Sequence, residues 1–207
     1  MSQILTIHPK TPQPRLIDCA AATLARGGLL VHPTDTAYAL GCQIGNKTAA
    51  ERIRTLRRLD RNHLFTLLCR DLSALATYAR VDNRTYRQLK AHTPGPFTFV
   101  LEATREVPRR LQLGKRKQIG LRVPAHRILQ ALLEALGEPI LSSTLTLPGA
   151  DYPLTDPAEI QTALGPQVDL ILDGGHGTHA ESTVVDMTGP VPQLIRPGLG
   201  NFAHLTP

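Results

Sequence analysis

Small oxygen-bearing side chains follow a short apolar strand near the start of the sequence. Leu29–Val31 leads through His32-Pro33 into Thr34-Asp35-Thr36. Open α/β sheets collect ligands beyond their strand ends, so this segment is a candidate binding loop. The competing interpretation is an Asx or ST turn whose hydroxyls only satisfy the backbone, and taken alone the segment favours the turn.

One arginine interrupts an otherwise apolar strand. Arg122 lies within Ile119–Val123, which Pro124 closes. Arginine is rarely buried without an anion, and its planar guanidinium matches a carboxylate or a phosphate. Two interpretations stay open: Arg122 binds a substrate anion, or it forms a structural ion pair with an internal carboxylate such as Asp169 or Asp186.

Hydroxyls and a second arginine mark three further strand boundaries. They lie in the segments Ile140–Gly149, Ser182–Asp186 and Leu194–Gly198. This set suits an anionic, hydroxyl-bearing ligand better than a nucleophile and base. Phosphate-binding loops of the P-loop and Rossmann types are absent from the sequence. His176 and His179 share a glycine-rich loop without a third histidine, so we predict no protein-held metal site.

Positive charge is clustered along the chain, which has 23 Lys and Arg against 17 Asp and Glu and a net charge of +6. Such clusters attract phosphates and give salt-dependent affinity for nucleic acid. The alternative is a solvated basic surface that only aids solubility. The residues predicted to contact RNA are Arg52, Arg54, Arg58, Arg61, Arg109, Arg110, Lys115, Arg116 and Lys117.

The elements that must position these residues alternate irregularly between helix and strand. Helices are expected over Pro12–Gly27, Thr48–Leu59, Leu72–Tyr78, Asn83–His92 and His126–Leu136. Strands are expected over Leu29–Val31, Phe65–Cys69, Phe97–Glu102, Ile119–Val123, Ile140–Ser143, Val168–Leu172, Thr183–Asp186 and Gln193–Ile195. Without a strict βαβ rhythm, this order predicts an α/β (α+β) fold: one domain over residues 1–207, with a twisted mixed sheet flanked by helices.

The cellular setting is expected to be the cytoplasm. No apolar run reaches the ~18–20 residues of a membrane span, and the N-terminus lacks the pattern of a secretory signal. The three cysteines form no CxxC pair, and we predict that they are reduced structural thiols. We therefore expect no membrane partner.

Five motifs together resemble the YrdC-like family, which includes threonylcarbamoyl-AMP synthases. They are Pro33-Thr34-Asp35-Thr36-x-Tyr38-x-Leu40-Gly41, Thr93-Pro94-Gly95-Pro96-x-Thr98, Leu121-Arg122-Val123-Pro124, Ser182-Thr183-Val184-Val185-Asp186 and Arg196-Pro197-Gly198. The resemblance covers about residues 10–200, and details such as Phe65–Asp71 and Val107–Arg110 most resemble the YciO branch.

The resemblance implies a concave basic cavity that holds threonine, bicarbonate and ATP, with Mg²⁺ accompanying ATP. The synthases form threonylcarbamoyl-adenylate and pyrophosphate, the first step of the t6A modification of tRNA. By position, the substrate-binding residues are Thr36, Arg122, Ser142 and Ser182. The nucleotide-binding residues are Arg57, His63, Thr144, Thr146 and Arg196, and no catalytic residue is assigned.

The chain departs from the synthases at two motifs. Arg57-Arg58-Leu59 replaces their Lys-x-Arg, and Thr144-Leu145-Thr146 replaces their Ser-x-Asn. Each lost charge-assisted contact to a triphosphate costs about 1.5–3 kcal/mol. Two functional hypotheses therefore follow. The first is a threonylcarbamoyl-AMP synthase-like protein that binds ATP or AMP and a threonine-like substrate, with weak or altered activity. The second is a non-catalytic module that binds RNA (double-stranded RNA or tRNA) or a nucleotide.

Overall fold

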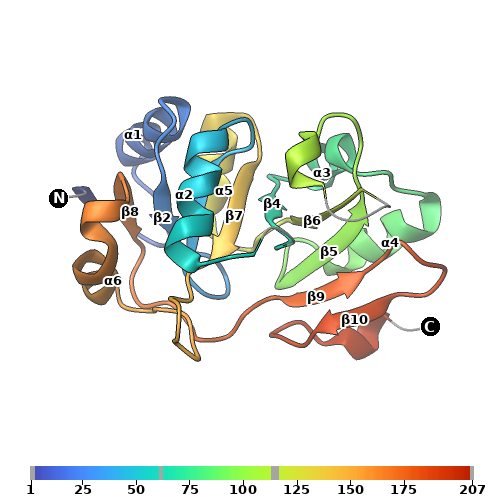
Figure 1. Ribbon diagram of the computed structural model, residues 1–207. Coiled ribbons are helices and arrows are strands. Elements are labelled where there is room, and N and C mark those ends of the chain that lie inside the picture. Colours follow the sequence, from blue (N-terminus) through green and yellow to red (C-terminus); the bar gives the residue numbers. More distant parts are fainter. Residues whose placement is uncertain (1–2, 61–62, 113–116, 206–207) are drawn as a thin grey trace.

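A mixed ten-stranded sheet forms the centre of the computed structural model, which describes residues 3–60, 63–112 and 117–205 (Figure 1). The strand order is β1-β8-β2-β3-β7-β4-β6-β5-β9-β10. The strands are β1 Gln3–Thr6, β2 Leu30–His32, β3 Ala39–Gln43, β4 Thr66–Leu68, β5 Phe97–Glu102, β6 Gln118–Arg122, β7 Ile140–Thr144, β8 Leu170–Asp173, β9 Thr183–Asp186 and β10 Gln193–Arg196.

Helices cover the sheet on both sides because each presents one apolar face. On one side, α1 (Pro14–Ala25) packs against α5 (Arg127–Leu136) over a core that includes Ile17, Leu24 and Leu132. The larger core on the other side takes apolar residues from α2 (Lys47–Arg57), α3 (Leu72–Tyr78), α4 (Asn83–His92) and α6 (Pro157–Leu164). Three 3-10 turns, η1 Arg109–Leu111, η2 Gly165–Gln167 and η3 Phe202–Leu205, complete the described elements.

The predicted single mixed sheet flanked by helices is confirmed. The bounds of α3, α4, β5 and β9 are those expected, and Asp82 caps α4 by accepting a hydrogen bond from the Thr85 amide at 2.7 Å. Gly137, in the left-handed conformation at φ 72°, ends α5. Among the described residues, none of the helices combines the length and apolar character needed to cross a membrane.

Three elements were not predicted: β1, β3 and α6. The β3 sequence Ala-Leu-Gly-Cys-Gln has no run of β-branched residues, and pairing with β2 on one side and β7 on the other holds it as a strand. For α6, Asp156 caps the helix and Pro157 occupies its first turn, which is a sequence signature of a helix start.

Buried His32 makes the stability of the fold depend on pH. Its side chain is fully buried in β2, and burial lowers its pKa to about 4. Between about pH 6.5 and pH 4 the unfolded chain therefore binds a proton that the folded chain does not. The free energy of unfolding is expected to fall by roughly 3 kcal/mol as pH falls through this window.

The His32→Gln variant tests this expectation by urea unfolding at a series of pH values. The slope of unfolding free energy against pH should decrease in this variant and should be unchanged in His176→Gln, because His176 is exposed. An undiminished slope in His32→Gln would contradict the assignment.

Candidate functional site

Arg122 forms the centre of a buried hydrogen-bonded network. Its Nη2 donates to Oδ1 of Asp35 at 2.6 Å, and its Nη1 donates to Oγ1 of Thr36 at 3.0 Å. The Nε group contacts the carbonyl oxygen of Gly95 at 3.4 Å. The expected internal ion pair therefore exists, but the suggested partners were wrong: Asp169 pairs with Arg52, and Asp186 accepts from Thr188. Asp35 reaches Arg122 because the β2–β3 loop folds across to β6.

The Thr34-Asp35-Thr36 segment is both a turn and part of this network. Oγ1 of Thr34 donates to the carbonyl oxygen of Ala37 at 2.7 Å and accepts from the amide of Thr36 at 3.0 Å. Because Thr34 already donates its hydroxyl proton to Ala37, the Thr36 hydroxyl is the donor in the 2.9 Å hydrogen bond between the two threonine oxygens. The turn thereby orients the Thr36 oxygen as an acceptor for Arg122.

A second arginine enters the same region from the end of α2. Arg57 donates through Nη1 to Oγ of Ser143 at 2.7 Å and through Nε to the carbonyl oxygen of Thr146 at 3.0 Å. Nε2 of His63 lies 3.3 Å from the same Ser143 oxygen. Burial, followed by the charges of Arg57 and Arg54, lowers the pKa of His63 to about 4, so its ring is neutral at pH 7.

The third arginine is held at the junction of β9 and β10. Arg196 pairs with Glu181 at 2.7 Å and donates through Nη2 to the carbonyl oxygen of Ser182 at 2.9 Å. The Ser182 hydroxyl lies 2.8 Å from that of Thr98 on β5, in a buried contact. These bonds tie both outer strands to the centre of the sheet.

Together these residues line a cavity of about 260 Å³ over the central strands. Thr66 on β4 and Gly41 on β3 both stand opposite Ser142 in the sheet register, which brings these strands to one place. Of the predicted ligand residues, the cavity is lined by Thr36, Arg57, His63, Arg122, Ser142, Thr144, Ser182 and Arg196. Thr146 is not among the lining residues, but its carbonyl anchors Arg57.

Sequence reasoning gave no ligand role to Thr98, Ser143 and Glu181, which line the cavity, and it placed Asp35 in the candidate loop without recognising it as the partner of Arg122. Each lies within or next to a motif already singled out, but adjacency along the chain does not show which side chain points inward. For Ser143, strand alternation alone would place it on the opposite face from Ser142. The approach of Arg57 from α2 is what brings Ser143 to the cavity.

The cavity is suited to an anion. It contains three guanidinium groups, of which Arg122 pairs with Asp35 and Arg196 with Glu181. Within the described part of the chain Arg57 forms no ion pair, and burial lowers the pKa of its guanidinium, which nevertheless stays charged. Arg57 is half-buried, and the charge of Glu181 favours its cation without forming an ion pair with it, so an anionic ligand beside Arg57 would be stabilised further.

The donor set fits Mg²⁺ carried by phosphates better than a metal held by the protein. Among the described residues that line the cavity, Glu181 is the one with a carboxylate, and that carboxylate already pairs with Arg196. Nor do the described ranges bring three or more His, Cys, Asp or Glu side chains together as a metal site. Magnesium commonly binds through substrate phosphates with one or two carboxylates.

Arg110, one of the residues predicted to contact RNA, binds the turn before α2. It donates to the carbonyl oxygens of Ile44 and Gly45 at 3.1 and 2.8 Å, which docks η1 on the turn before α2. Arg52 pairs with Asp169, and Arg54 lies over the Phe65 ring at 4.8 Å, so both contact the protein itself. Of the other predicted RNA contacts, Arg58, Arg109 and Lys117 are exposed, whereas Arg61, Lys115 and Arg116 fall outside the described residues.

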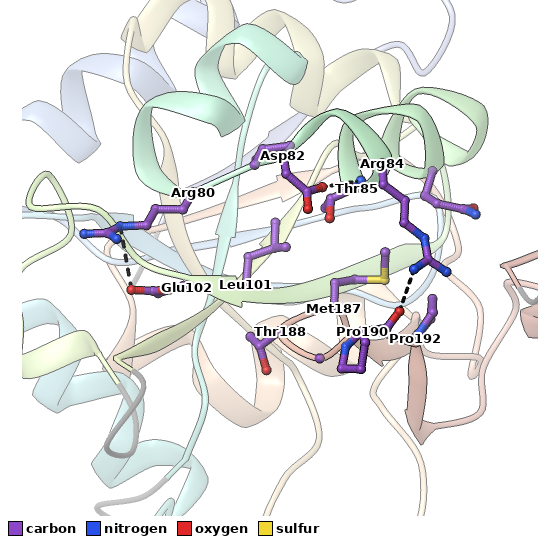
Figure 2. Close-up of a pocket in the computed structure, with 13 residues that line it drawn as sticks. Arg80, Asp82, Arg84, Thr85, Leu101, Glu102, Met187, Thr188, Pro190 and Pro192 are labelled. Carbon is purple, nitrogen blue, oxygen red and sulfur yellow. Dashed lines mark hydrogen bonds and ion pairs between the residues drawn. The ribbon is translucent and has the colours of Figure 1, made fainter.

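A larger hollow of about 660 Å³ lies elsewhere, between the start of α4, β5 and the turn after β9 (Figure 2). Arg80 pairs there with Glu102 at 3.6 Å, and Arg84 donates to the carbonyl oxygen of Pro190 at 2.7 Å. Asp82 is used as the cap of α4. Since each of these charged groups already has a partner within the protein and both arginines are exposed, this hollow lacks the convergent buried donors of the central cavity.

Comparison with known proteins places this arrangement in a family. A family model for Sua5, YciO and YrdC, described as "Telomere recombination", matches residues 22–198. The chain belongs to the Sua5/YciO/YrdC family. It is 53% identical over 201 residues to "Uncharacterized protein YciO" of Escherichia coli K12, covering 97% of this chain and 98% of that one. It is 31% identical over 180 residues to a threonylcarbamoyl-AMP synthase of Xanthomonas campestris, covering 86% and 94%.

Solved structures of the Sua5/YciO/YrdC family share the fold. The crystal structure of E. coli YciO superposes with a TM-score of 0.96 at 52% identity, covering 99% of this chain and all of that one. The P. abyssi Sua5 structure, complexed with L-threonine, gives a TM-score of 0.87 at 27% identity and covers 95% of this chain but 58% of the longer Sua5 chain. The predicted membership of the YrdC-like family, with YciO among the similar proteins, is confirmed.

Proposed function

We propose that the central cavity binds a small amino acid such as L-threonine together with ATP, and that the chain carries out threonylcarbamoyl-AMP synthesis. The observation that carries this proposal is the buried Arg122–Thr36 contact inside a cavity that collects three guanidinium groups. Support comes from the threonylcarbamoyl-AMP synthase relative and from the Sua5 structure with L-threonine.

Each arginine has a distinct role in the proposed reaction. Arg122 holds the amino-acid carboxylate, because its fork can make parallel charge-assisted hydrogen bonds. Arg57 and Arg196 lie toward the nucleotide and offset the charge of its phosphates, with Mg²⁺ arriving as the ATP complex. The Ser142 and Ser182 hydroxyls orient the amino acid beside Arg122. Catalysis of this kind rests on positioning and charge stabilisation.

The activity test uses the purified chain with L-threonine, bicarbonate, ATP and Mg²⁺. Pyrophosphate and threonylcarbamoyl-adenylate are expected to form in equal amounts, and omission of L-threonine or bicarbonate should prevent both. The unmodified chain is compared with Ser182→Ala, which removes one hydroxyl that contacts Thr98 and Arg196. This variant should have a higher KM for L-threonine. Absence of both products in the unmodified chain would reject the proposal.

Restoring the two missing motif residues is expected to strengthen nucleotide binding. Leu59 is partly buried against the larger core, and an arginine there can pack its stem while extending its guanidinium. The Leu59→Arg/Thr146→Asn variant should bind ATP about tenfold more tightly, because each contact to phosphate contributes about 1.5–3 kcal/mol before the cost of ordering the side chain. Isothermal titration calorimetry measures this gain.

Leu56→Arg is the matched control for added charge, since Leu56 lies in the last turn of α2, three residues before Leu59, and is also partly buried against that core. It should leave ATP affinity within about twofold of the original. Equal affinity in the double variant and the unmodified chain would indicate that the cavity has changed its nucleotide preference.

Contact with RNA is a second candidate function, favoured by the exposed basic side chains of Arg58, Arg109 and Lys117. Double-stranded RNA or tRNA should bind with an affinity that falls steeply as salt rises. The Arg58→Ala/Arg109→Ala variant should weaken binding and reduce the salt slope. Weak, salt-insensitive binding would count against this function.

A further inference from the structure

One carboxylate oxygen of Asp35 is hydrogen bonded, and the other has no partner among the described residues. Oδ1 accepts from Arg122 at 2.6 Å, and the two side chains are only 12% and 6% exposed. Oδ2 is also buried, and among the described residues it has no hydrogen-bond partner. A buried carboxylate oxygen without a donor is costly, so a nearby group that gains a proton would stabilise it.

His126 carries a second buried polar atom without a partner among the described residues. It stands at the start of α5, and this atom is its Nδ1. The charged groups that influence the pKa of His126 are Asp35 in the β2–β3 loop and Arg122 on β6. The titratable side chain of His32, buried on β2, also interacts electrostatically with His126. Burial lowers the pKa of His126 and Asp35 opposes this effect, so the ring is neutral at pH 7.

Arg122 retains capacity for a ligand. A guanidinium has five N–H groups, and within the described structure the hydrogen bonds of Arg122 to Gly95, Thr36 and Asp35 use three of them. A ligand carboxylate on the remaining donors would share the same cation with Asp35. Two carboxylates in one buried site repel each other and increase the proton affinity of their neighbours.

We propose that binding of a ligand carboxylate to Arg122 is coupled to the uptake of one proton by His126, whose imidazolium then donates a hydrogen bond to Oδ2 of Asp35. The inference rests on the proposed function, in which Arg122 holds the amino-acid carboxylate. The proton comes from solvent and adds to a ring nitrogen, and no covalent bond between heavy atoms forms or breaks. His126 is a positioning residue that compensates charge without contacting the ligand.

The first experiment tests the chain without ligand. The titration of the His126 ring is followed by NMR, with its signal assigned by its loss in His126→Gln. Asp35→Asn should lower the proton affinity of His126 by about threefold or more, because it removes the opposing charge. Exposed His176 provides a reference signal in the same spectra. An unchanged titration of His126 would overturn the coupling.

The second experiment counts protons on binding. L-threonine is titrated near pH 6 in buffers of different ionisation enthalpy. The unmodified chain and His176→Gln should take up a substantial fraction of one proton, whereas His126→Gln should take up almost none. Binding without proton uptake would overturn the inference and leave the proposed function standing.

Failure of L-threonine to bind would instead reject the proposed function. The His126 titration repeated in sodium formate, with sodium chloride as reference, then decides the coupling with the smallest carboxylate. A higher proton affinity in formate supports the inference, and an equal one overturns it.

Discussion

Replacing Arg122 by alanine is expected to abolish binding of L-threonine and to lower the free energy of unfolding by about 3–5 kcal/mol. The variant leaves Asp35 as a buried carboxylate without its cation, and it leaves the Thr36 oxygen without its donor. An unpaired buried charge costs far more than the pair contributes when intact. Calorimetry with L-threonine and urea unfolding measure the two effects.

Binding and folding are separated by a double variant. Asp35→Asn/Arg122→Met removes both charges and keeps most of the side-chain volume, so it should regain much of the lost stability but none of the affinity. Recovery of L-threonine binding in this folded variant would contradict the role given to Arg122. Equal instability in both variants would show that the lost stability does not come from the unpaired Asp35.

Gly198→Ala is expected to have the second large effect, a loss of about 2–3 kcal/mol and a Tm lowered by about 5–10 °C. A Cβ at this position would clash with the carbonyl oxygen of Glu181 and would lie 2.6 Å from the amide nitrogen of Thr183. These are backbone atoms, which cannot turn aside as a flexible side chain can. The segment after β10 must therefore move away from the start of β9.

The same displacement should weaken ligand binding. Arg196 reaches Glu181 and Ser182 only because these two segments lie against each other. Gly189→Ala is the matched control in the turn between β9 and β10, where the nearest atom to an added Cβ is 3.7 Å away. Thermal unfolding and L-threonine affinity should both change in Gly198→Ala and stay close to the original in Gly189→Ala. Similar Tm values for the two variants would contradict the close-packing argument.

Several elements could be predicted because their local pattern and their packing agree. The strand Phe97–Glu102 has dense apolar and branched residues, and α4 follows a capping aspartate. By contrast, β3 contains glycine and small residues, and it is a strand only because β2 and β7 pair with it. Local propensity does not contain that information.

By itself, the sequence determined the family motifs, the mixed α/β character and the residue types that gather at strand ends. These are hydroxyl-bearing residues, arginines and the aspartate of the Thr34-Asp35-Thr36 loop. Only the tertiary structure decided the partners. It paired Arg122 with Asp35 and assigned Asp169 to Arg52. It also brought Arg57 from α2 to Ser143. The physical reason is that a charge is stabilised by an opposite charge or a polar partner, and which partner lies within reach depends on how distant segments fold together.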